Sequence, residues 1–270
     1  MSRHVQHLRT QLVLAEIAPN TYFMNHVLYA ELRRGNYRVS WKIYQDMSKV
    51  VRPDLETFAC LWDCEKAHLD RATSHSIAEF PTPRYIFCDM ITFFHNLGRG
   101  VQDVTRDAFS RDLYDLIIRC LCLSNDLEGT VVALYAFKDY FSFYPDQNTL
   151  RMVTLQVARI RQKRPDVSKK SRRQRVRGGV DSRIDLAQIS QVLELLTEKR
   201  EQDLQKRNIK SNELDKRMQL EEHLFVFTEF LRMVLANNAL PNKSVSDSIE
   251  KVAWDMGVGG IRMGDPLLPV

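Results

Sequence analysis

A pattern of about 35 residues, with two short helix-forming segments and a Pro-Asp ending, is the feature that most limits how this chain folds. Residues 22–32 carry apolar side chains at helical spacing, and Gly35 ends that segment because glycine readily adopts the left-handed conformation. A second apolar-periodic segment covers residues 37–49, and the chain leaves it before Pro53 because proline disfavours helix in the preceding residue. The spacing predicts two antiparallel helices of about a dozen residues each.

The same plan recurs further along the chain. Residues 111–146 contain two apolar-periodic segments separated by Ser124-Asn125-Asp126, and they end at Pro145-Asp146. A period near 35 residues with two helices per repeat is typical of an α-solenoid, in which stacked helix pairs share their apolar faces. We therefore predict an all-α fold, an α-solenoid of antiparallel helix pairs.

Short motifs at fixed places in these repeats resemble the pentatricopeptide repeat family. The first repeat carries Thr21-Tyr22-Phe23-Met24-Asn25, Gly35, Ile43-Tyr44-Gln45-Asp46-Met47 and Pro53-Asp54. The match resumes at Leu55-Glu56-Thr57-Phe58 and at Ile86-Phe87-Cys88-Asp89-Met90, and a further first helix begins at Gln147-Asn148-Thr149. The resemblance implies a stack of helix pairs that holds single-stranded RNA.

The resemblance covers roughly residues 4–158. It divides them into repeats at about 21–54, 55–110 and 111–146, with half-repeats at 4–20 and 147–158. We interpret residues 69–83 as an insertion between the two helices of the second repeat. Half a repeat cannot bury its own apolar face, so we expect the chain to be a C-terminal fragment of a larger protein, and the resemblance implies that this protein is organellar.

The charges are gathered in one short segment. Residues 1–158 hold 17 basic and 18 acidic residues, and residues 178–270 hold 12 and 15, whereas residues 159–177 hold 10 basic residues and one acidic residue. We expect residues 159–180 to be a disordered or mobile loop, because dense like charges repel one another. Apolar periodicity predicts a helical extension over residues 181–256, including a helix that Ser244 or Ser246 caps, and glycines predict a flexible tail at 257–270.

The resemblance also implies which residues contact RNA. In that family a polar residue of the first helix and the last residue of the repeat read one base, and here they correspond to Asn25 and Asp54, a pair that implies uridine. The structural alternatives are a solvated Asn25 and a helix cap at Asp54. At the corresponding positions, the second repeat has Ala59, which cannot form a hydrogen bond with a base. The third repeat has two acidic residues there, Asp115 and Asp146. Arg151 in the last half-repeat is a candidate for phosphate contact or stacking.

The basic segment is the second candidate RNA contact. Its central lysines and arginines are suited to phosphates, but the segment lacks aromatic residues for stacking, so we expect its contact to be non-specific. A nuclear-localisation-like signal or a solubilising loop are the open alternatives. The residues concerned are Lys169, Lys170, Arg172 and Arg173.

The sequence offers no catalytic or metal-binding motif that exceeds chance, so we expect no enzyme activity, no cofactor and no small-molecule substrate. Cys60, Cys64 and His68 are spaced to share a helix face, and we interpret them as two buried thiols and a nearby histidine. The chain shows no membrane-spanning run and no targeting segment. The expected function is non-catalytic RNA binding in mitochondrial RNA processing, stability or translation, a compartment implied by the resemblance. The alternative is a protein-interaction scaffold, which the acidic balance of residues 1–158 favours.

Overall fold

The structure is a computed structural model that describes residues 7, 10, 11, 19–71, 80–162, 182–207, 215–237 and 244–267. Within these ranges the chain forms eleven helices and no strand, which confirms the predicted all-α class. The chain divides into two compact units. The first comprises Met1–Ser124 and Ala253–Gly259, and the second comprises Asn125–Val252 and Gly260–Val270.

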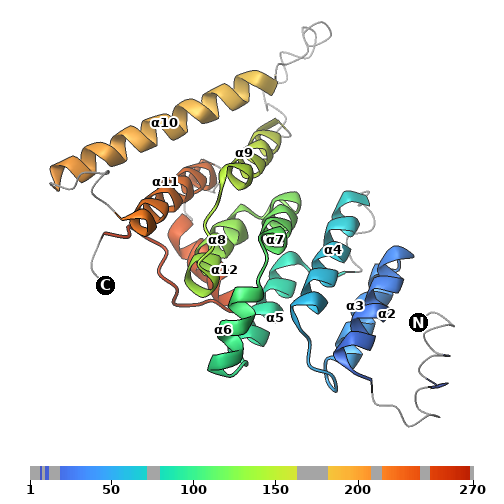
Figure 1. Ribbon diagram of the computed structural model, residues 1–270. Coiled ribbons are helices and arrows are strands. Elements are labelled where there is room, and N and C mark those ends of the chain that lie inside the picture. Colours follow the sequence, from blue (N-terminus) through green and yellow to red (C-terminus); the bar gives the residue numbers. More distant parts are fainter. Residues whose placement is uncertain are drawn as a thin grey trace, which may run out of the picture. The chain divides into compact units, whose positions relative to one another are not determined.

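The first compact unit contains the helices α2 to α7 (Figure 1). They are α2 (Thr21–Arg33), α3 (Tyr37–Met47), α4 (Leu55–Arg71), α5 (Pro83–His95), α6 (Arg99–Ala108) and α7 (Arg111–Leu123). α2 packs on α3 and α4, while α4 packs also on α3, α5 and α7. The first helices of the three predicted repeats, α2, α4 and α7, thus contact one another in chain order.

Local sequence signals set the boundaries of these helices. Asn20 and Asp54, each directly after a proline, accept a backbone hydrogen bond at 2.8 Å from Phe23 and Thr57, respectively. Such caps satisfy N–H groups that the first turn of a helix leaves without a partner. Gly35 follows α2 with a φ of 73°, the left-handed conformation expected from the sequence.

The core of the first compact unit is aromatic and aliphatic. Its largest fully buried side chains include Phe58, Trp62, Phe87 and Tyr114. Cys60 and Cys64 are buried free thiols on α4, and His68 is buried one turn further along the same helix. The interpretation of these three residues as core thiols with a nearby histidine is confirmed.

The second predicted repeat differs from the structure in two ways. Residues 69–71, placed in the predicted insertion, belong to α4, and the described part of the chain resumes at residue 80 just before α5. In addition, α6 was not predicted. None of its residues is buried, so it lacks the buried apolar stripe on which a prediction from hydrophobic periodicity depends.

The second compact unit contains the remaining helices. They are α8 (Leu127–Phe141), α9 (Gln147–Gln162), α10 (Ser182–Lys206), α11 (Lys216–Ala236) and most of α12 (Val245–Asp255). α11 packs on α8 and α10, and α10 packs also on α9. The Ser244 hydroxyl accepts a bond at 3.3 Å from the N–H of Asp247, so of the two predicted caps Ser244 is the one observed.

A buried charge cluster joins α10 and α11 to the C-terminal segment. The Arg200 guanidinium donates two bonds to Glu222, at 2.6 and 2.9 Å, and two bonds to Asp265, also at 2.6 and 2.9 Å. These bonds lower the pKa of Asp265 to about 2, against burial, which raises it. Removing Arg200 would leave the Glu222 carboxylate buried without this partner, a change that is strongly destabilising.

Residues 257–259 pack within the first compact unit, although the sequence predicted a flexible tail there. Val258 is buried, and a Cβ added to Gly257 would lie 3.1 Å from Cys88 Sγ. Gly257 also has a φ of 73°, which favours glycine. Glycine at position 257 is therefore explained by the turn and by the close approach to Cys88, and not by a flexible tail.

Candidate functional site

Asn25 and Asp54, the predicted base-reading pair, come together in the first compact unit. Asn25 lies on α2, and Asp54 directly precedes α4. Asn25 Nδ2 donates to Asp54 Oδ1 at 3.1 Å, and Asn25 Oδ1 accepts from the Thr57 hydroxyl at 2.7 Å. The three side chains form one bonded group, here called the Asn25 cluster, where α2 meets α4.

The Asn25 cluster is buried. Asn25 and Thr57 have an exposed fraction of 0%, and Asp54 is half-buried. Because the oxygen and the nitrogen of the amide both bond within the chain and neither is exposed, Asn25 does not meet a base in this conformation. The alternative of a solvated Asn25 is therefore wrong, and the alternative of a helix cap at Asp54 is confirmed.

The same cap occurs at the start of α9 in the second compact unit. The backbone N–H of Thr149 donates to Asp146 Oδ1 at 2.9 Å, and the Thr149 hydroxyl donates to the same oxygen at 3.0 Å. Both caps share the sequence Pro-Asp-x-x-Thr. Asp54 and Asp146 therefore each cap the start of a helix, α4 and α9, respectively.

The other repeat positions considered from the sequence lie on several helices. Arg151 is an exposed residue of α9, and Ala59 is a half-buried residue of α4. Asp115 forms an ion pair with Arg111 at 3.5 Å along α7. The basic residues Lys169, Lys170, Arg172 and Arg173 lie outside the described residues.

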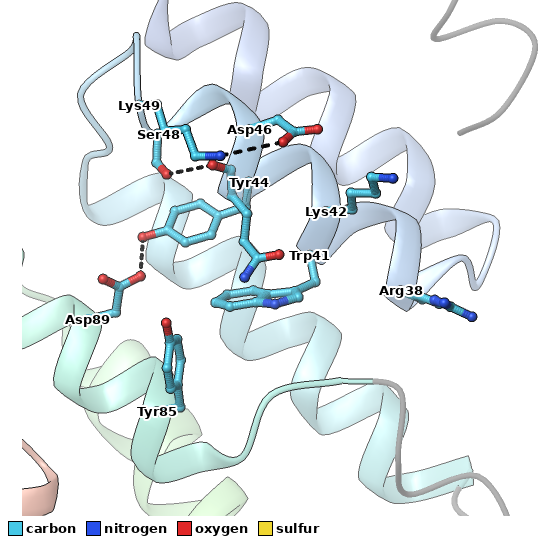
Figure 2. Close-up of a pocket in the computed structure, with 10 residues that line it drawn as sticks. Arg38, Trp41, Lys42, Tyr44, Asp46, Ser48, Lys49, Tyr85 and Asp89 are labelled. Atoms are coloured by element: carbon cyan, nitrogen blue, oxygen red, sulfur yellow. Dashed lines mark hydrogen bonds and ion pairs between the residues drawn. The ribbon is translucent and has the colours of Figure 1, made fainter.

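A cavity of about 560 Å³ opens between α3 and α5 in the first compact unit (Figure 2). The half-buried Trp41 of α3 and the exposed Tyr85 of α5 have ring centroids 5.6 Å apart at an interplanar angle of 84°. Tyr44, from the buried side of α3, has its ring 5.2 Å from that of Trp41. The three rings give the cavity two aromatic walls and a floor.

Polar groups complete this Trp41–Tyr85 pocket. The Tyr44 hydroxyl donates to Asp89 Oδ2 at 2.5 Å, and burial, together with this bond, raises the pKa of Tyr44, so the phenol stays protonated. Arg38 and Lys42 lie one turn apart on α3, and Lys49, two residues beyond the end of that helix, also lines the pocket. Lys49 is also 3.8 Å from Asp46. The lining therefore combines aromatic rings, hydrogen-bond acceptors and more positive than negative charge.

Sequence reasoning did not predict this pocket. The available signal was the alternation of basic and aromatic residues along residues 38–49, a combination associated with nucleic-acid binding. Apolar periodicity assigned this helix to packing, which is true of Tyr44 but not of the face that carries Lys42. The partner ring, Tyr85, lies 44 positions beyond Trp41 and is brought close only by the fold.

No helix among the described residues has the length and apolar character needed to cross a bilayer. Nor does that part of the chain gather three histidine, cysteine or acidic side chains at a place where they would hold a metal ion. Comparison of the chain with models of known protein families and with curated proteins finds no match in either set.

Proposed function

We propose that this chain belongs to a pentatricopeptide-like α-solenoid that binds single-stranded RNA without catalysing a reaction. The observation that carries the proposal is the order of contacts in the first compact unit: α2 packs on α4 and α4 on α7, while α2 and α4 each also pack on the helix that follows. Helix pairs stacked in this way present their first helices as one extended face, which suits an extended strand.

The proposed role is in mitochondrial RNA processing, stability or translation, the setting that the family resemblance implies. The chain holds a single strand and thereby excludes nucleases or recruits a partner. Asn25 is not required as a base reader in this proposal, because it is buried in its own cluster. Arg151 and the basic residues Lys169, Lys170, Arg172 and Arg173 are the proposed phosphate contacts.

Fluorescence anisotropy of a labelled oligouridine, titrated with the full chain, tests this proposal. We expect saturable binding at about 50 mM salt that weakens steeply by about 200 mM, because each neutralised phosphate releases counterions. A duplex of the same length serves as the matched control and is expected to bind less tightly. Absence of binding to the single strand at the lower salt concentration would rule out the RNA function.

A protein-interaction scaffold without RNA is the second candidate, and one observation favours it. α6 has no buried residue, and its valines Val101 and Val104 are 51% and 68% exposed. Exposed apolar side chains close together on a helix often mark a contact with another protein. If the oligouridine does not bind at low salt, this candidate replaces the first.

A further inference from the structure

We propose that the Trp41–Tyr85 pocket binds one nucleotide, with the base against the two rings and the phosphate at Lys42 and Arg38. The nucleotide is either one unit of a single-stranded RNA or a free nucleotide, since both present the same chemistry. Where it belongs to RNA, the inference rests on the proposed function. It then adds a contact on the second helices α3 and α5, whereas the family resemblance assigns base reading to the first helices.

The aromatic walls have the geometry that a base needs. Trp41 and Tyr85 stand nearly perpendicular, at 84° with centroids 5.6 Å apart, and Figure 2 shows both rings bordering the cavity. A base stacked on one ring turns its own edge toward the face of the other, and aromatic pairs favour both offset stacking and edge-to-face contact. Base stacking of this kind contributes to affinity for any base, because every base has a π-face.

The cations are placed for a phosphate beside that base. Arg38 and Lys42 both line the pocket and lie one turn apart on α3, and in Figure 2 both side chains extend on the side away from Asp89. Lys42 is exposed, so its ammonium reaches an anion without a large cost of burial. Base and phosphate can therefore occupy the pocket together.

Acceptors at the floor of the pocket suit the edge of a base. Asp89 accepts one bond from Tyr44, and an ionised carboxylate has lone pairs for several more. The amide of Gln45, which lines the pocket from α3, both donates and accepts. An amino or imino group of a base thus finds an acceptor at Asp89, and a carbonyl finds a donor at Gln45.

The balance of charge favours an anionic ligand over a cationic one. Aromatic rings beside carboxylates also bind quaternary ammonium groups. Here, however, Arg38, Lys42 and Lys49 outnumber Asp46 and Asp89 around the pocket. Because Lys49 lies 3.8 Å from Asp46, the surplus of one positive charge comes from Arg38 and Lys42 against Asp89, and it favours a phosphate over a cation.

Tryptophan fluorescence of the full chain tests the inference directly. Of the three tryptophans, Trp62 is fully buried and Trp254 is 65% exposed outside the pocket. We expect uridine monophosphate and oligouridine to quench the emission, the Trp41→Phe variant to lose that quench, and the Trp254→Phe variant to keep it. Tyr85→Ala is expected to weaken binding about tenfold, and Lys42→Ala several-fold. The matched controls, Trp254→Phe and Arg99→Ala, alter exposed residues outside the pocket and are expected to leave affinity unchanged.

The outcomes separate this inference from the proposed function. If oligouridine binds by anisotropy but Tyr85→Ala and Lys42→Ala bind it like the controls, RNA binding stands and the nucleotide pocket is refuted. If only the monophosphate quenches Trp41 and oligouridine does not bind by anisotropy, the pocket takes a free nucleotide and the RNA function fails. Quenching by tetramethylammonium and by neither nucleotide form would overturn the inference in favour of a cation site. Far-ultraviolet circular dichroism of each variant establishes that it is folded.

Discussion

Glu65 is a buried carboxyl group whose environment makes its charge costly. Its exposed fraction is 2%, and its Oε2 atom has no hydrogen-bond partner among the described residues. Burial raises the pKa of Glu65 from the ordinary value of 4.5 to about 8. The folded state therefore retains this proton at neutral pH, whereas the unfolded chain has already released it.

The stability of the first compact unit should for this reason fall as the pH rises from about 4.5 to about 8. Within that window the folded state binds more protons than the unfolded state, and each pH unit lowers the free energy of unfolding by up to about 1.4 kcal/mol. Glu65→Gln removes the titrating group, so the variant is expected to lose this part of the pH dependence. Urea unfolding at a series of pH values measures the free energy of unfolding of the wild type and of the variant.

Glu56→Gln is the matched control, because Glu56 is an exposed residue of the same helix. Its pH profile should follow that of the wild type. Parallel profiles for Glu65→Gln and the wild type would contradict the prediction and would mean that Glu65 is hydrated in solution.

At the scale of helices, the Asn25 cluster shows how a polar side chain joins two elements. Asn25→Ala removes a donor to Asp54 and leaves the buried Thr57 hydroxyl without its acceptor on α2. The Thr57 hydroxyl keeps Asp54 Oδ1 as an acceptor at 2.9 Å, so the cost is the loss of two hydrogen bonds at about 0.5–1.5 kcal/mol each. We therefore expect a lower urea midpoint for Asn25→Ala and almost no change for Asn148→Ala, an exposed asparagine near the start of α9.

The same pair of variants decides between a structural and an RNA-reading role for Asn25. One outcome is that Asn25→Ala has the same urea midpoint as the Asn148→Ala control but no longer prefers oligouridine over oligoadenosine. The amide of Asn25 then contacts a base, and the Asn25 cluster opens in solution. If stability falls while the preference of the folded protein is unchanged, Asn25 joins α2 to α4 and nothing more.

The starts of helices could be predicted from the sequence because their causes are local. The surroundings of individual side chains could not, because they depend on residues far away in the sequence. Asp54 caps α4 through Thr57, only three residues away, so the Pro-Asp signal was sufficient. The burial of Asn25 depends on Thr57, 32 positions distant, and periodicity gives no information about such a contact. The pocket likewise needs Trp41 and Tyr85 from two helices. The helix α6 was not predicted because none of its residues is buried, so it has no buried apolar stripe.

At the scale of the whole chain, the net charge of +5 conceals an uneven distribution. Residues 159–177 contribute 10 basic residues and one acidic residue, whereas the segments on either side are slightly acidic. A strand bound only to the helical part would therefore meet little net positive charge. Under the proposed function, the basic segment supplies most of the salt-dependent attraction to RNA.

Replacing residues 163–177 with a glycine-serine linker of equal length tests that division of charge. The replacement removes eight basic residues and one acidic residue but keeps α9 and the length of the connection. We expect weaker oligouridine binding at low salt and a shallower slope of log affinity against log salt, by about 0.7 for each phosphate that the variant no longer neutralises. A variant in which the same residues are shuffled controls for order and should keep the slope. If the linker variant also keeps it, the basic segment does not contact RNA, and a localisation signal or a solubilising loop remains as its role.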